Sequence, residues 1–538
     1  MRTAQAEAQP PLSKASNIAH NIEHAFAHYQ QGRLADAETI CNAILAAEPE
    51  DFDALHLLGL LRHAQERNAE ALRLVGAVLK RAPRSAEVLS NYGLILAALS
   101  RHEEALVCFE EALDHSAGYL NALRNRAASL KALARDEEAL LAFAAIVATK
   151  DDDIDALNEC GGLHMRLSRP DAAIACYDKA LAIAPQVAEL HINKGSALAA
   201  SNRFDDALHS FAAAIAIAPG RAEAHYKASL IRLRVGDFRS GWRDYEWRWR
   251  CERTPIVRRV AAPLWLGEQP IKGKTIFLLG EQGFGDTIQF IRYAPLVAAL
   301  GATVLVDVPP QLREIAASVP GVSSVVCGAE PTPHVDYRCP LLTLPLSFQT
   351  EVATIPANVP YIRPPEERVA KWRERLPQNG RLRVGLCWAG SPEHLNDRNR
   401  SIAIERFAKV LSVPNLDFVS VQKEVNERQA AILHENNVVE LGQDFQDFAD
   451  TAAVLAQLDL LISVDTSVAH LAGAMGKPVA LLLPWSPDWR WMHERTGTPW
   501  YPTMLFFRQA TRGDWDGPFE QLYQELSALA VRRPKASG

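Results

Sequence analysis

The sequence predicts an α + α/β chain, with a helical solenoid in its first half and two α/β halves after it. Short runs of β-branched apolar residues alternate with helical stretches from residue 274 onward, which is typical of parallel sheets. In the first half, by contrast, a small residue recurs every 34 positions, at Ala37, Ala71, Ala105, Ala139, Ala173, Ala207 and Gly241.

Two further columns keep this 34-residue period. One is mostly glycine or alanine, and the other is mostly proline, as at Pro83, Pro185 and Pro219. Small residues let two antiparallel helices approach closely, and a proline ends the second helix. This pattern is the signature of tetratricopeptide helical hairpins. We therefore expect a tetratricopeptide repeat (TPR) α-solenoid over residues 18–250, after a disordered lead-in over 1–17.

The last repeat unit, residues 236–250, is rich in tryptophan, tyrosine and arginine. Such a stripe could stack on nucleobases. It could equally dock the solenoid on the domain that follows, since aromatic and arginine side chains suit a packed interface. We favour docking. Residues 251–273 contain three prolines and are expected to form a connector.

Two tandem α/β halves are expected after the connector, over residues 274–365 and 381–515, with a helix and tail over 516–538. Apolar runs of strand length begin both halves, KTIFLLG in the first and LRVGLCWAG in the second. Two halves of this kind predict a pair of Rossmann-like domains with a cleft between them. In open sheets of this type, ligands bind at the carboxyl ends of the strands.

Composition excludes several classes of function. A net charge of -7 argues against general nucleic-acid binding, and no apolar run approaches the ~20 residues of a transmembrane segment. The eight cysteines include no C-x-x-C pair, so neither a zinc site nor a disulfide framework is indicated. Scattered free cysteines suit a reducing compartment, and we expect a cytoplasmic protein.

The first candidate motif is the glycine-rich turn GEQGFGDTIQF, residues 280–290. Its spacing differs from the dinucleotide-binding fingerprint. Gly285 and Asp286 would lie at the start of a helix, at the carboxyl edge of the first strand, where Gly285 is expected to bind a phosphate group of the ligand. Asp286 could act chemically there, or it could simply cap the helix.

The second motif runs from a buried strand into a helix, at ISVDTSVAHLAGAMGKP. Asp465 ends the strand, and Thr466 and Ser467 open the helix, whose free N–H groups form an anion site suited to a diphosphate. His470 could face the same phosphate or be a buried wall residue.

The third motif is the polar loop WAGSPEHLNDRNRSI, residues 388–402. Gly390 and Ser391 could donate hydrogen bonds to a ligand, and Arg398 and Arg400 could neutralise a diphosphate. A solvated charged loop is the alternative. Gln422 ends the next strand and could contact a base or ribose.

A fourth segment, residues 481–509, is rich in aromatic residues and proline. Its aromatic side chains could wall a sugar or base pocket, but core packing is the interpretation that we favour.

The motifs with Asp286, with residues 390–402 and with Asp465–His470 resemble the heptosyltransferase-like family of GT-B glycosyltransferases. The whole chain resembles bacterial proteins in which TPRs are fused to such a domain, and its layout is similar to that of O-linked N-acetylglucosamine transferase. The resemblance implies a GT-B-type pair of domains.

The resemblance also assigns roles. It makes Asp286 the catalytic base, and it places Arg400, where relatives commonly have lysine, on the donor diphosphate. Asp465, Thr466, Ser467 and His470 match the donor-gripping segment, although Ser467 stands where the family has glycine. Similarity to the N-acetylglucosamine transferase suggests that the asparagines Asn91, Asn125 and Asn193 hold an acceptor polypeptide.

We therefore expect an inverting, metal-independent glycosyltransferase without a cofactor, whose donor is a nucleotide-diphosphate sugar. The acceptor, a protein or a glycan, would be recruited by the solenoid, and nucleic acid is not expected as a partner. The alternative is a non-catalytic TPR scaffold with a degenerate transferase domain. A hydrolase is disfavoured, because the sequence lacks both a G-x-S-x-G elbow and a P-loop.

Overall fold

The computed structural model describes residues 14–252, 257–393 and 396–532. The chain divides into two compact units, Met1–Leu198 and Ala199–Gly538.

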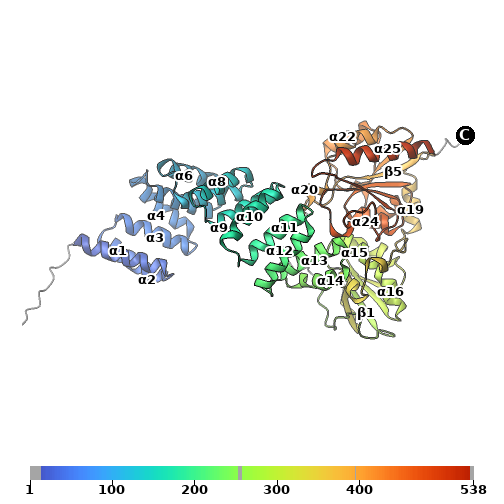
Figure 1. Ribbon diagram of the computed structural model, residues 1–538, viewed down its shortest axis with the longest axis horizontal. Helices are drawn as coiled ribbons and strands as arrows, with labels where there is room; N and C mark the ends of the chain where they lie inside the picture. Colours follow the sequence, from blue (N-terminus) through green and yellow to red (C-terminus); the bar gives the residue numbers. More distant parts are fainter. Residues whose placement is uncertain (1–13, 253–256, 394–395, 533–538) are drawn as a thin grey trace, which may run out of the picture. The chain divides into compact units, whose positions relative to one another are not determined.

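The first unit is a succession of antiparallel helical hairpins, which confirms the predicted solenoid (Figure 1). The first helix begins at Lys14, four residues before the predicted start. The helices are α1 (Lys14–Gln30), α2 (Leu34–Ala47), α3 (Phe52–Ala64), α4 (Asn68–Arg81), α5 (Ala86–Ala98), α6 (His102–His115), α7 (Leu120–Ala132), α8 (Asp136–Thr149), α9 (Ile154–Arg166), α10 (Pro170–Ile183) and α11 (Ala188–Ala200).

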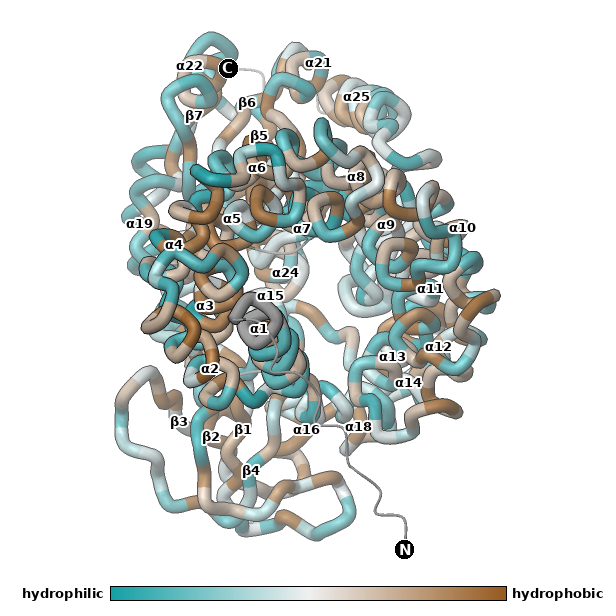
Figure 2. Tube along the Cα trace, turned by 90° about the vertical axis from the view of Figure 1, so that its left-hand side faces the viewer, coloured by the Kyte–Doolittle hydropathy of each residue, from teal (hydrophilic) through white to brown (hydrophobic). Residues whose placement is uncertain are grey.

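Small residues explain the hairpin packing. Ala71 and Ala105 are fully buried, and a Cβ on Gly93 would lie only 2.6 Å from the Phe109 ring, so the helices meet without space for a larger side chain. Figure 2 shows hydrophobic and hydrophilic residues alternating along α3 to α6, as expected of helices with one buried face. Side chains cap several of the helices; the Asp51 carboxylate, for example, accepts the Ala54 N–H at 2.8 Å.

The second unit begins with the last repeat helices, α12 (Phe204–Ile217), α13 (Ala222–Val235) and α14 (Phe238–Tyr245). Phe238, Trp242 and Tyr245 belong to the same buried cluster as Trp489 and Trp500 of the second α/β half. These contacts explain why the boundary between the compact units falls at 198/199 rather than at residue 250. They support the docking interpretation of the aromatic stripe.

The first α/β half has a four-stranded parallel sheet in the order β3-β2-β1-β4. Hydrophobic residues such as Ile276 and Val306 fill its core. Its elements are β1 (Thr275–Leu279), α15 (Phe284–Phe290), α16 (Ala294–Ala299), β2 (Thr303–Val308), α17 (Arg313–Ala317), β3 (Val322–Cys327), β4 (Tyr337–Pro340) and α18 (Leu344–Ser347).

The second half has a six-stranded parallel sheet in the order β10-β9-β8-β5-β6-β7. Its elements are α19 (Glu366–Arg373), β5 (Leu382–Cys387), α20 (Asp397–Arg400), α21 (Ala408–Leu411), β6 (Leu416–Ser420), α22 (Glu427–Glu435), β7 (Val439–Glu440), α23 (Phe448–Leu455), β8 (Leu460–Val464), α24 (Ser467–Ala474), β9 (Val479–Leu483), β10 (Met504–Arg508) and α25 (Asp516–Arg532). The chain leaves one side of the sheet after β7 and returns on the other side of β5 as β8, so a crevice opens between β5 and β8.

The α + α/β class is confirmed, and most expected strands are present at the expected places. Two details differ. The aromatic segment 481–509 holds the edge strand β10, because MLFFR extends the sheet beside β9. The other is that β4 is limited to Tyr337–Pro340, because 3-10 and α-helical turns follow Pro340 at once.

Candidate functional site

The second unit contains a cavity of about 750 Å³, lined by residues of both α/β halves. Its walls come from segments that follow the strands at their carboxyl ends. They include residues 283–286 after β1, 421–424 after β6, 445–448 after β7, 465–468 after β8, and 487, 488 and 490 after β9, with residues from the loop after β5. A cavity in this position lies at the topological switch point of the six-stranded sheet, where doubly wound folds bind ligands.

Asp286 lies on the wall that the first half contributes. Its carboxylate accepts the Gly283 N–H at 2.9 Å, which is the helix-capping contact considered for this residue. The same carboxylate also forms an ion pair with Arg490 of the second half. Asp286 therefore both caps α15 and faces the cavity.

Glycine at position 285 brings the two halves together. A Cβ at Gly285 would lie 2.9 Å from Cδ2 of His470, so only glycine allows α15 to approach α24 this closely. Both helices lie at the junction of the two halves in Figure 1. The carboxylate at 286 and the helix beginning at Ser467 thus face one cavity.

Arg490 is a cavity residue that the sequence analysis missed. It is 7% exposed, and its guanidinium donates to Asp488 and to Gln289, both at 2.8 Å, besides its pair with Asp286. It also stacks 4.4 Å from the centre of the Trp489 ring. The sequence offered only an arginine between two tryptophans, and its partner in the first half is 204 residues away.

Helix α24 begins at the cavity without a side-chain cap. Thr466 is the N-cap residue, but its hydroxyl lies 3.2 Å from that of Ser463 and accepts no N–H of the helix. The first turn of the helix therefore presents backbone N–H groups beside Ser467 and Val468, which line the cavity. Such a turn favours an anion.

Arg400 lies next to this helix start. Its Nη1 donates to the Asp465 carbonyl oxygen at 2.9 Å, and its Nε lies 3.2 Å from Asp397. The guanidinium passes so close to Gly390 that a Cβ there would overlap Nη2. Glycine at 390 is therefore what allows the arginine to reach the end of β8 from the loop.

His470 is buried, and it forms a hydrogen bond through Nδ1 with the Tyr501 hydroxyl at 3.0 Å. Burial, together with the charge of Arg490, lowers the pKa of His470 to about 3. The ring is therefore neutral near pH 7 and can offer a hydrogen bond, but no positive charge, to a phosphate. Burial and the Asp488 carboxylate raise the pKa of Asp465 to about 6.

Of the other predicted donor-site residues, some line the cavity and others do not, and one of them also holds a neighbouring loop in place. Ser391 is exposed and lines the cavity, whereas Arg398 is exposed and does not line it. Gln422 lines the cavity, but its amide oxygen accepts the N–H groups of Trp388 and Ala389 and so fixes the loop after β5. Residues 394–395 of the predicted loop lie outside the described residues.

The asparagine column belongs to the first unit. Asn91 contacts His56 at 3.0 Å, Asn125 donates to Ser90 at 3.4 Å, and Asn193 donates to Asn158 at 2.9 Å. Each of these partners lies 35 residues earlier in the sequence, so each half-buried amide links two successive repeats.

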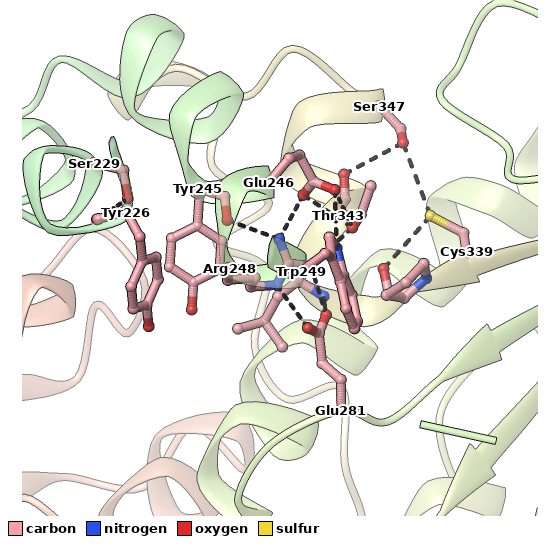
Figure 3. A network of polar contacts seen from close by, with 12 residues as sticks. Tyr226, Ser229, Tyr245, Glu246, Arg248, Trp249, Glu281, Cys339, Thr343 and Ser347 are labelled. Atoms are coloured by element: carbon pink, nitrogen blue, oxygen red, sulfur yellow. Dashed lines mark hydrogen bonds and ion pairs between the residues drawn. The ribbon is translucent and has the colours of Figure 1, made fainter. Parts of the chain in front are cut away.

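A buried polar network joins the last repeat to the turn that carries Asp286 (Figure 3). Arg248 binds both carboxylate oxygens of Glu281, at 2.7 and 3.0 Å, and also donates to Glu246 and Thr343. Glu281 also accepts the Leu342 N–H at 3.0 Å. Because Glu281 lies two residues after the end of β1 and two before Gly283, this network holds the beginning of the Gly283–Asp286 turn in place.

Within the described ranges, no group of three or more His, Cys, Asp or Glu residues is arranged to hold a metal ion. In the same part of the chain, no helix has the length and apolar character that a membrane crossing requires.

Comparison with known proteins identifies the repeats. The tetratricopeptide repeat family model matches residues 22–76, 56–119, 161–222 and 192–238. The N-terminal region therefore carries TPRs. Protein FlbA of Caulobacter vibrioides is 26% identical over 334 residues, which is 57% of this chain and 55% of that protein. The chain thus spans about half the length of the curated relative that it matches.

Solved TPR structures are also similar to part of the chain. A thermophilic TPR protein of Thermus thermophilus has 23% identity and a TM-score of 0.29, with 34% of this chain and 98% of that chain covered. PilF of Pseudomonas aeruginosa has 20% identity and a TM-score of 0.35, with 38% and 94% covered.

Proposed function

We propose that this protein is a glycosyltransferase with a GT-B-type pair of α/β domains and a TPR scaffold that recruits its acceptor. One observation carries the proposal. The cavity at the switch point is lined by an uncapped helix start and an arginine of the second half, and by a carboxylate of the first half. A nucleotide-diphosphate sugar fits this distribution of charge.

The donor diphosphate would bind at the start of α24. Backbone N–H groups there offer hydrogen bonds, and the positive end of the helix dipole favours the negative charge. Arg400 adds a guanidinium, whose donors match phosphate oxygens. These groups would also stabilise the charge that develops on the departing diphosphate. His470, neutral at pH 7, would contribute a hydrogen bond.

Asp286 would act as the general base. It would accept the proton of the acceptor hydroxyl while that oxygen forms a bond to the anomeric carbon and the bond to the diphosphate breaks on the opposite face. The configuration of the sugar is thereby inverted. Arg490 directs the Asp286 carboxylate through the ion pair between them.

The same ion pair supports a second candidate function. A carboxylate already engaged by a buried arginine is well suited to hold two domains together. The protein would then be a TPR scaffold whose α/β region binds a nucleotide or a partner without turnover. Transfer to an acceptor distinguishes the two functions.

Donor binding by the full chain tests the proposed site. Thermal unfolding with a panel of nucleotide-diphosphate sugars should show one donor that raises the melting temperature, because a ligand of the folded state stabilises it by mass action. Arg400→Gln should weaken that donor about ten- to hundredfold, as expected for loss of a charged hydrogen bond of ~1.5–3 kcal/mol.

Arg398→Gln is the matched control, because it removes the same charge two residues away, outside the cavity. It should leave donor affinity unchanged. Equal effects of the two substitutions, or no nucleotide sugar that binds, would argue against the site.

A further inference from the structure

The first unit has a small cavity of its own, among its first three hairpins. Its volume is about 270 Å³, and its walls come from α1, α3 and α5, the first helices of these hairpins. The volume is below the ~300–1,000 Å³ of typical small-molecule sites, so the cavity suits a protruding side chain. Phe26 is 46% exposed there. The apolar residues of the wall are Ile22, Phe26, Leu57 and Leu60.

Three carboxylates line the same cavity. They belong to Glu23, Asp53 and Glu87, which are all exposed, and none of them forms an ion pair among the residues that the structure describes. Elsewhere in these hairpins, by contrast, Glu38 is paired with Arg62 at 2.8 Å. Of the described residues that line the cavity, none is a lysine or an arginine. The wall therefore carries negative charge that the solenoid does not neutralise.

Two of these carboxylates stand in one column of the repeats. Asp53 and Glu87 lie 34 positions apart, each in the first turn of its helix, where the helix dipole favours a negative charge. The same column holds Asp155 and Glu189, in the first turns of α9 and α11. The dipole thus explains an acidic residue at all four positions. Only the first two lie beside the cavity, together with Glu23, which is outside the column.

The wall also has an unused hydrogen-bond donor. His56 is 8% exposed and lines the cavity, and its Nε2 lies 3.0 Å from the amide nitrogen of the Asn91 side chain. Burial lowers the pKa of His56, so the ring is neutral at pH 7 and carries one hydrogen. Because Nε2 accepts from the Asn91 amide, that hydrogen is on Nδ1, which has no acceptor among the described residues. A backbone carbonyl oxygen of a ligand would satisfy it.

We propose that this cavity binds a basic segment of a partner protein, in which one large apolar side chain is flanked by lysine or arginine residues. The apolar side chain would fill the cavity beside Phe26, and the flanking cations would pair with the three carboxylates. Because the carboxylates come from three different helices, they suit several charges along an extended polypeptide better than a single amine. Such recruitment does not depend on whether the second unit transfers a sugar.

Binding of labelled peptides to the full chain tests the cavity, with fluorescence anisotropy as the readout. The probes are the peptides Lys-Lys-Leu-Lys-Lys and Lys-Lys-Phe-Lys-Lys, and the references are Lys-Lys-Gly-Lys-Lys and Glu-Glu-Leu-Glu-Glu. We expect the better probe to bind at least about tenfold more tightly than the glycine peptide, because burial of its apolar side chain is favourable. The glutamate peptide should not bind, and added salt should weaken binding of the probes.

A matched pair of double variants separates the cavity from general attraction to an acidic protein. Asp53→Asn/Glu87→Gln removes two carboxylates from the wall and should weaken binding of the better probe about three- to tenfold, as expected for two exposed charge contacts. Asp155→Asn/Glu189→Gln removes the same charges from the same helix positions, three repeats further on and outside the cavity. It should leave binding unchanged.

The apolar wall has its own pair of variants. Phe26→Ala should weaken the better probe about threefold or more, whereas Leu141→Ala, which shortens a 70% exposed side chain of α8, should not. Spermidine should compete poorly, because it has no apolar side chain to fill the cavity. If neither probe binds more tightly than the glycine peptide, if the two double variants weaken binding equally, or if spermidine competes as well as the unlabelled probe, the proposal is wrong.

Discussion

The two α/β halves are built alike but contribute unequally to the cavity. The four strands of the first sheet follow the order β3-β2-β1-β4, and the second sheet repeats this order in β7-β6-β5-β8 before adding β9 and β10. Yet the first half lines the cavity with residues 283–286 and Gln311, whereas the second half supplies the rest of the wall.

This difference suggests a division of labour. The second half has the helix start, Arg400 and the buried His470, which are groups suited to holding an anionic ligand. The first half contributes one carboxylate, that of Asp286. The turn that carries it is held by the buried ion pair between Arg248 and Glu281. We infer that binding depends mainly on the second half and chemistry on a single residue of the first.

The largest expected effect comes from Asp286→Asn. If Asp286 is the general base, the substitution should lower the transfer rate by at least about a hundredfold, the range typical of lost acid–base catalysis. Donor affinity should stay within about twofold, because the groups proposed to hold the diphosphate belong to the second half. Steady-state transfer kinetics and donor titrations measure the two quantities.

Arg490 complicates this test, because Asp286→Asn also breaks an ion pair between the halves. Asp488→Asn is a useful control, since it removes another carboxylate partner of Arg490 and leaves Asp286 in place. Transfer that falls equally in both variants would point to a structural role for Asp286, and transfer that persists in Asp286→Asn would remove it as the base.

The next largest effect is expected on stability, from the buried ion pair that joins the last repeat to the first α/β half. Arg248→Met leaves Glu281 buried without its partner, and loss of one member of a buried pair typically destabilises a protein by about 3–5 kcal/mol. The double variant Arg248→Met/Glu281→Leu should recover much of that loss. Chemical denaturation of the full chain measures the free energy of unfolding of the second unit.

An exposed pair in the same half is the control. Lys274 and Asp336 lie 3.1 Å apart, with side chains 49% and 35% exposed, and Lys274→Met should cost at most about 1 kcal/mol. If Arg248→Met has no larger effect than Lys274→Met, the network does not hold the turn.

The sequence predicted the groups that lie in continuous motifs. The strand that ends at Asp465, followed by Thr466 and a helix, is continuous in the sequence, so the pattern alone places these residues at a helix start. The 34-residue period likewise predicts the repeats, because each hairpin contacts its neighbours in the chain. Arg490 and the Arg248–Glu281 pair could not be found in this way. Their partners lie 204 and 33 residues away, and only tertiary packing brings them together.

Local patterns also left the environment of each residue undetermined. The position of His470 one turn into a helix was predictable, but its neutral state follows from burial against Trp491 and Tyr501 and from the charge of Arg490. The charge pattern of the loop did not distinguish Arg398 from Arg400, and only the family resemblance singled out Arg400. The structure separates them, because the single turn of α20 places only Arg400 on the wall of the cavity.

The smallest predicted effect tests the second half through pH. The pKa of Asp465 is raised to about 6, so this carboxyl group is protonated in the folded state at pH 4–5 and ionised above pH 6. An acid with a raised pKa destabilises the folded state where it is ionised. Asp465→Asn should therefore stabilise the protein at pH 7 by about 1–2 kcal/mol, since each pKa unit corresponds to ~1.4 kcal/mol and solvent at the cavity wall reduces the full value.

This gain should shrink as the pH falls from 6 towards 4, because the wild-type carboxyl then becomes neutral as well. Asp336 of the first half offers a control of opposite sign. A hydrogen bond from the Thr275 N–H, followed by one from Lys274, lowers the pKa of Asp336, so Asp336→Asn should lose stability at pH 7. The measurement is the melting temperature of each variant relative to the wild type between pH 4 and 7. If Asp465→Asn melts lower than the wild type at pH 7, the ionised Asp465 carboxylate stabilises the folded state. Burial and the Asp488 charge would then not be the dominant influences on this residue at the start of α24.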